Sequence, residues 1–151
     1  MSKLNFDKVI KKFDKLKQDL PKVLANDAVR YFNQSFVKGG WDGQSWKVPD
    51  RKIPGTYAYK YPKKGASRRH TRATLVESGA LRRAVATSVK RVSFSSIKFM
   101  VALPYAAIHN EGLQMKYGGR MPKRKFMGDS PQLRNLQRRK IKNAIQAIWQ
   151  A

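Results

Sequence analysis

Apolar and charged residues alternate with helical periodicity through the first 36 residues. This pattern predicts a long amphipathic helical region over about residues 5–36. Pro21 interrupts the pattern, and because proline lacks a backbone donor and crowds the preceding turn, we expect either a kink or two abutting helices there. Gly39 and Gly40 then signal the end of the helix. The apolar positions are Phe6, Val9, Ile10, Phe13, Leu16, Leu20, Val23, Leu24, Ala28, Val29, Phe32 and Phe36.

Residues 37–74 are predicted to form a long connection, because glycine and proline recur too often for a sustained element. Tyr57, Tyr59 and Tyr61 occupy alternate positions, which permits a short strand. The part from 47 to 72 holds nine basic residues and a single acid. A structureless loop of this length is usually functional, or disordered until a partner binds.

The middle of the chain indicates a short helix followed by a hairpin. Ser78 is expected to be the N-cap of the helix. Residues 85–92 and 97–102 each alternate with a period of two, which predicts antiparallel strands joined through 93–96. Pro104 is expected to end the second strand.

The last third predicts two more helices. Residues 105–111 suit one or two helical turns closed by Gly112, and a further strand is expected around 125–127. Ser130 and Pro131 are typical of the N-cap and first position of a final helix. One broad apolar face of that helix is formed by Leu133, Leu136, Ile141, Ala144, Ile145 and Ile148.

These elements predict an α+β fold in which the long N-terminal helix and the C-terminal helix pack on a small antiparallel sheet. A length of 151 residues is typical of one domain. We therefore expect a single domain over 1–151. Its parts are the helical region 5–36, a basic loop over 37–74, a sheet with short helices over 75–130, and the C-terminal helix over 131–150.

Composition narrows the class of protein. The chain is 41% hydrophobic and has no cysteine, which excludes a disulfide framework, a thiolate metal site and a cysteine nucleophile. No apolar run approaches the roughly 20 residues needed to cross a bilayer. The first residues lack the apolar region of a signal peptide. We expect a soluble protein made in the cytoplasm, with no membrane partner.

The charge is strongly unbalanced, with 33 basic residues against nine acidic ones and a net charge of +24. Residues 1–36 hold eight basic and four acidic residues, whereas the other 115 hold 25 and five. Such a field attracts nucleic acid, anionic lipid or an acidic protein. Two interpretations stay open, a solvated basic surface and functional anion binding. The candidate contacts are Arg68, Arg69, Arg72, Lys123, Arg124, Lys125 and the row Arg134, Arg138 and Lys142 on the last helix.

The sequence offers no plausible catalytic set. His70 and His109 are the only histidines, too few for zinc without cysteine. Ser78 lacks the context of a nucleophile elbow, and neither a dinucleotide fingerprint nor a P-loop is present. Paired carboxylates for acid–base chemistry are scarce. We therefore expect no enzyme activity, no metal and no cofactor, and we interpret His109 as a packing residue.

Aromatic residues allow a packing or a binding interpretation. Trp41 and Trp46 either cover the end of the sheet or the long helix, or they anchor an interface, where tryptophan concentrates binding energy. We expect the four residues Tyr105, Ile108, Phe126 and Met127 to be core. The three basic residues 123–125 are expected to stay exposed.

Four segments, in order, resemble the virion morphogenesis (tail completion) family of Mu-like tailed phages, which is related to head–tail joining proteins. The resemblance covers about residues 40–130. It combines a tryptophan-containing turn, a Ser-Gly-x-Leu helix start, Tyr-Ala-x-x-His-x-x-Gly and Pro-x-Arg-x-Phe-x-Gly. The segments are Gly40-Trp41-Asp42-Gly43-Gln44-Ser45-Trp46, Leu75-Val76-Glu77-Ser78-Gly79-Ala80-Leu81-Arg82, Pro104-Tyr105-Ala106-Ala107-Ile108-His109-Asn110-Glu111-Gly112, and Met121-Pro122-Lys123-Arg124-Lys125-Phe126-Met127-Gly128.

The resemblance implies a structural, non-enzymatic protein of a phage or prophage that acts in tail completion or head–tail joining. It implies a ring-like homo-oligomer in the virion, with tail or connector proteins and DNA passing through the assembly as partners. The family supplies no catalytic residues, and its motif positions are expected to serve fold and assembly. The basic insertion between Trp46 and Leu75 departs from the family, so its role is not transferred. The alternative function is a basic DNA- or RNA-binding protein.

Overall fold

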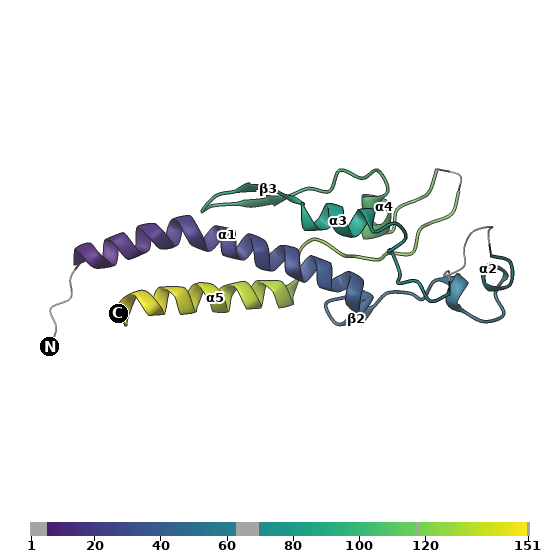
Figure 1. Cartoon of the computed structure of the whole chain (residues 1–151), viewed down its shortest axis with the longest axis horizontal. Helices are drawn as coiled ribbons and strands as arrows, with labels where there is room; N and C mark the ends of the chain where they lie inside the picture. Colours follow the sequence, from purple (N-terminus) through teal and green to yellow (C-terminus); the bar gives the residue numbers. More distant parts are fainter. Residues whose placement is uncertain (1–5, 63–69, 117, 151) are drawn as a thin grey trace. The chain divides into compact units, whose positions relative to one another are not determined.

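The computed structural model describes residues 6–62, 70–116 and 118–150, and its first element is one long helix, α1 (Phe6–Lys38) (Figure 1). The helix continues through Pro21, so the alternative of two abutting helices is wrong. Pro21 is buried, as are Ala25 and Ala28 on the following turns. Burial of this face offsets the hydrogen bond that the proline removes. The helix ends where predicted, because Gly39 adopts a left-handed φ of 63°.

Two compact units make up the chain. The first contains residues 6–31, 88–100 and 129–150. In it α5 (Pro131–Trp149) runs antiparallel to α1, because Lys140 pairs with Asp27 whereas Trp149 meets Phe13 further toward the start of α1 (Figure 1). The Lys140 Nζ to Asp27 Oδ2 distance is 2.5 Å, and the two rings have their centroids 6.1 Å apart.

Ser130 begins α5 as predicted. Its hydroxyl accepts the N–H of Leu133 at 3.1 Å and donates to the Tyr31 hydroxyl at 3.0 Å. Leu133 and Ile148 are buried, but Ile145 is 37% exposed, so the predicted apolar face is covered only in part. Capping by a buried serine therefore ties the start of α5 to α1 within this unit.

The predicted hairpin is confirmed but is shorter than expected. Strand β3 (Val89–Val92) pairs antiparallel with β4 (Ile97–Phe99), with an irregularity between Val89 and Arg91. Residues 85 and 86 instead belong to the helix α3 (Ala80–Ala86), because Leu81 and Val85 stand one turn apart and are both buried.

The second unit contains residues 32–62, 70–87, 101–116 and 118–128. Its short elements are the antiparallel pair β1 (Gly40–Trp41) and β2 (Gln44–Ser45), the 3-10 turn η1 (Asp50–Lys52), α2 (Tyr57–Lys60), α3 and α4 (Ala106–Glu111). The short strand that the alternation of Tyr57, Tyr59 and Tyr61 permitted does not form, so this prediction is wrong. Thr56 caps a helical turn there by accepting the N–H of Tyr59 at 3.2 Å, and the rings of Tyr57 and Tyr61 lie 4.8 Å apart.

Two further local predictions need correction. The N-cap of α3 is Gly79, at φ 74°, and not Ser78, whose hydroxyl accepts the N–H of Ala80 at 3.3 Å. Residues 125–127 form no strand, because their backbone is held by a side chain instead of by a neighbouring strand. Gly112 does close α4, at φ 68°.

The α+β fold class is confirmed, with a long N-terminal helix, a C-terminal helix and antiparallel strands. The described strands form two separate two-stranded sheets, one in each compact unit, where one sheet was expected. The single domain over 1–151 stays a prediction.

Candidate functional site

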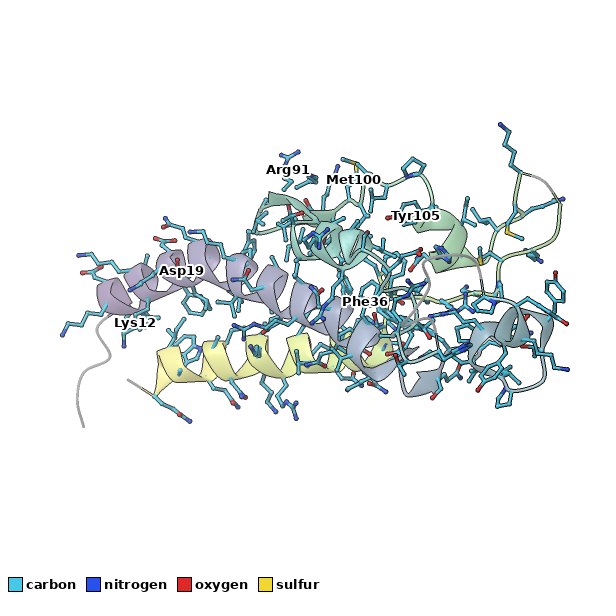
Figure 2. The ribbon with its side chains drawn as sticks, turned by 45° about the vertical axis from the view of Figure 1, so that its right-hand side comes forward. Lys12, Asp19, Phe36, Arg91, Met100 and Tyr105 are labelled. Atoms are coloured by element: carbon cyan, nitrogen blue, oxygen red, sulfur yellow. The ribbon has the colours of Figure 1, made fainter. Side chains whose placement is uncertain are left out.

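An aromatic cluster forms the centre of the second compact unit. Phe126 is 1% exposed, and its ring centroid lies 5.3 Å from that of Phe36 on α1 (Figure 2). Trp46 packs edge-on against Phe36 at 6.0 Å, and its Nε1 donates to the Lys125 carbonyl at 2.9 Å. The tryptophan therefore joins the turn at 40–46 to the segment 121–128.

Trp41 completes the cluster from the other side of the same turn. Its ring stacks on Phe32 of α1 at 6.0 Å, and the Lys125 ammonium lies 5.3 Å from the ring centroid. Packing of both tryptophans on the long helix is therefore confirmed. Their role as interface anchors stays a prediction.

Asn110 organises the same core and was not singled out from the sequence. Its Oδ1 accepts the backbone N–H groups of Phe126 at 2.9 Å and of Met127 at 3.1 Å. Its Nδ2 donates to the Met127 carbonyl at 3.1 Å. Asn110 lies two residues before the helix-ending Gly112, and its side chain carries both a donor and an acceptor. These two features were the signal in the sequence that could have indicated its role. No described strand pairs with this segment, and the carboxamide bonds to its backbone instead.

The prediction that residues 123–125 stay exposed is wrong for one of them. Lys123 is exposed and pairs with Glu111 at 3.4 Å, and Lys125 is half-buried. Arg124 is only 7% exposed. In an extended segment alternate side chains share a face, so Arg124 is buried on the same side as Phe126.

Arg124 lines a cavity of about 590 Å³ within this unit. We call it the arginine cavity and define it by Arg51, Arg72, Ser78, Tyr105, His109 and Arg124. Arg51 Nη2 donates to the carbonyls of Arg72 and Ala73 at 3.3 and 3.4 Å. Arg72 Nη1 lies 3.3 Å from the Glu77 carboxylate. Of the predicted contacts, Arg72 and Arg124 therefore meet in one cavity, whereas Arg68 and Arg69 lie outside the described residues.

His109 lines the cavity from α4, and its environment favours the neutral form of the ring. Burial lowers the pKa of His109, and the charge of Arg124 lowers it further. Burial also lowers the pKa of Arg124, against a smaller opposing effect of Asp50. Tyr105 meets the His109 ring edge-on at 6.1 Å but is 39% exposed, so its expected place in the core is wrong.

The predicted basic row on α5 belongs to the other compact unit. Arg134 pairs with Asp129 at 2.6 Å, and both side chains are largely exposed. Arg138 and Lys142 are exposed on the following turns. Exposed pairs of this kind contribute little to stability, so the row stays available to an anionic neighbour.

Within the described parts of the chain, no three histidine, aspartate or glutamate side chains gather in a way that could hold a metal ion. None of the described helices is long and apolar enough to cross a membrane.

Comparisons with protein-family models, with curated proteins and with solved structures give no match to this chain.

Proposed function

We propose that this chain is a structural, non-enzymatic morphogenesis protein of a tailed bacteriophage. It acts in tail completion or head–tail joining, as a ring-forming homo-oligomer located at the tail or the head–tail junction of the virion. Its partners are further copies of itself, tail or connector proteins, and DNA passing through the assembly.

The observation that carries the proposal is the convergence of the four family-like segments in one compact unit. The turn at 40–46 packs through its tryptophans on α1 and bonds to the segment 121–128. The segment 104–112 holds the same stretch through Asn110. The segment 75–82 lines one cavity with residues of both later segments. Several of the resembling positions, Trp46, Leu81 and Phe126 among them, are buried in one module, which supports a shared role in the fold.

The hairpin of the other unit supports self-association. A two-stranded sheet is marginal alone, and among the residues that the structure describes no third strand pairs with β3 or β4. Phe94 in its turn is 69% exposed. Met100 after β4, which is labelled in Figure 2, is 54% exposed. Exposed strand edges beside apolar side chains are surfaces that a neighbouring copy would cover.

Charge supports an anionic partner. The surplus of 24 positive charges is multiplied by the copy number in a ring, and that repulsion must be offset. DNA in the lumen, or an acidic surface on a tail or connector protein, would offset it. Exposed Arg138 and Lys142 on α5 are available for this contact.

The test is the mass of the particle across a salt series, by native mass spectrometry and electron microscopy, with and without duplex DNA. We expect closed oligomers whose formation depends steeply on salt. Phe94→Ser should weaken assembly and leave folding intact, whereas Tyr57→Ser, at a side chain 78% exposed on α2, should leave assembly unchanged. A strict monomer in every condition, even with tail or connector protein present, would refute the proposal.

The second candidate is a nucleic-acid-binding protein. It is favoured by Tyr57 and Tyr61, which are 78% and 63% exposed in the basic segment and offer stacking surfaces. Titration with duplex and single-stranded DNA separates the two candidates. Tight specific binding by the monomer at physiological salt favours this candidate, whereas weak binding that depends on length and salt favours the structural role.

A further inference from the structure

The arginine cavity contains a buried guanidinium whose donors are poorly satisfied. Arg124 is 7% exposed, and no described residue forms a hydrogen bond with its Nε. Nη1 lies 3.9 Å from the Met121 sulfur, and Nη2 lies 3.5 Å from the Lys47 carbonyl. Both contacts are longer than ordinary hydrogen bonds to oxygen. A buried cation with unused donors is costly unless an acceptor reaches it.

Two more buried polar atoms belong to residues that line the same cavity. Among the residues that the structure describes, Arg72 Nε and His109 Nδ1 have no hydrogen-bond partner. They come from separate parts of the chain, one ahead of α3 and one on α4. Buried polar groups are nearly always satisfied in native proteins, so three such atoms on residues that line one cavity indicate a missing polar partner.

The residues that line the cavity carry a net positive charge, which attracts an anion. Among the described residues, three arginines and one glutamate, Glu77, line the cavity, which gives a net charge of +2 while His109 is neutral. Asp50 acts on Arg124 from outside this lining. The Glu77 carboxylate pairs with Arg72, so it does not neutralise all three arginines. A volume of about 590 Å³ is in the range of small-molecule sites and exceeds a bare anion.

We propose that the arginine cavity binds a phosphate group, with Arg72 and Arg124 donating to its oxygens and His109 donating as a third partner. A carboxylate is satisfied by the fork of a single arginine, whereas a phosphate has oxygens enough for donors from several segments. The phosphate is either a free ion or a phosphodiester of DNA. The site stands independently of the proposed assembly role.

The experiment uses the side-chain NMR signals of the two histidines in the full chain. Inorganic phosphate is titrated at constant ionic strength, with chloride as the reference anion. We expect a saturable shift of the His109 ring signals with phosphate, and none with chloride. A single-stranded oligonucleotide forms the second arm. If it shifts His109 and competes with phosphate, the source is the DNA backbone; if only inorganic phosphate acts, the source is the free ion.

Matched variants decide whether phosphate shifts the His109 signals by binding in the arginine cavity. Arg72→Gln should weaken the phosphate response about tenfold or more, since a charge-assisted bond is lost. Arg124→Lys, which keeps the charge but loses the fork, should weaken it as well. If Arg124→Lys does not fold, Arg72→Gln decides the question alone. Arg82→Gln removes an exposed charge that does not line the cavity and should leave the response unchanged. An unsaturable response, or one equal in Arg72→Gln and wild type, overturns the proposal.

Discussion

The side-chain oxygen of Asn110 lies 2.9 Å from the backbone nitrogen of Phe126. Through this bond and its two contacts with Met127, one side chain fixes an extended segment that pairs with no strand in the described parts of the chain. The bond sets the position of Phe126 in the aromatic cluster. Alternate side chains of an extended segment share a face, so the same bond also orients Arg124 toward the cavity.

Asn110→Leu should therefore lower the free energy of unfolding by about 2 kcal/mol, because it leaves partly buried backbone groups without partners. Chemical denaturation followed by tryptophan fluorescence measures this change. Asn143→Leu, at an exposed position on α5, is the control and should change stability by less than about 0.5 kcal/mol. Equal effects at the two positions would show that the side chain does not hold the segment.

Gly112→Ala should be more damaging than Gly55→Ala. Both glycines have a left-handed φ, of 68° and 90°, so both substitutions introduce backbone strain. At Gly112 a Cβ would also lie 3.0 Å from the backbone of Lys123, whereas at Gly55 nothing lies within 4 Å. We expect a loss of about 1 kcal/mol for Gly55→Ala and clearly more for Gly112→Ala in thermal denaturation. Similar losses at the two positions would mean that the segment 121–128 shifts away from the added Cβ at residue 112 without a cost in free energy.

Asp27→Asn should weaken the contact between α1 and α5. The Asp27 side chain is 11% exposed and that of Lys140 is 42% exposed, so the pair is partly screened. We expect a loss of about 1 kcal/mol, which shrinks as salt is added. Asp14→Asn is the control, because its pair with Lys17 is exposed on both sides, and it should have almost no effect. Urea denaturation at low and high salt measures both; a loss that does not depend on salt would contradict the ion-pair explanation.

Stability should fall as the pH drops below about 6.5, the ordinary pKa of histidine. Burial and then Arg124 depress the pKa of His109 in the folded protein, so in this window the unfolded chain binds the proton more readily. The contribution of His109 is complete above its unfolded pKa and is lost as the pH falls toward the depressed folded pKa. His109→Gln should flatten this part of a denaturation profile between pH 5 and 8, whereas His70→Gln should retain it. An unchanged slope in His109→Gln would contradict the assignment.

Local signals predicted the elements whose causes lie within a few residues. The Ser130-Pro131 pair predicted the start of α5, and the helical spacing of apolar residues predicted α1. The strand allowed at the tyrosines failed, because the Thr56 hydroxyl stabilises a helical turn and an alternating pattern cannot reveal that bond. Periodicity likewise could not decide whether residues 85–86 are helix or strand. They belong to α3, where Val85 is buried.

The candidate site was only partly visible in the sequence. The segment 121–128 was recognised, but its arginine was expected in solvent, because a basic trio is ordinarily a solvated surface. Asn110 carried no motif of its own, and Arg51 looked like one of many basic residues in the loop. Their roles depend on residues more than 15 positions away, such as Phe126 for Asn110 and Arg72 for Arg51.

The sequence by itself determined the α+β class, the helix boundaries at Gly39, Gly112 and Ser130, the positive surplus and the lack of cysteine, because these follow from local backbone preferences and residue counts. Only the tertiary structure decided which of the basic residues is buried. It brought Arg72, His109 and Arg124 to one cavity, where three of their polar atoms have no hydrogen-bond partner among the described residues. Such a juxtaposition depends on long-range packing around Phe126, which no pattern of neighbouring residues encodes.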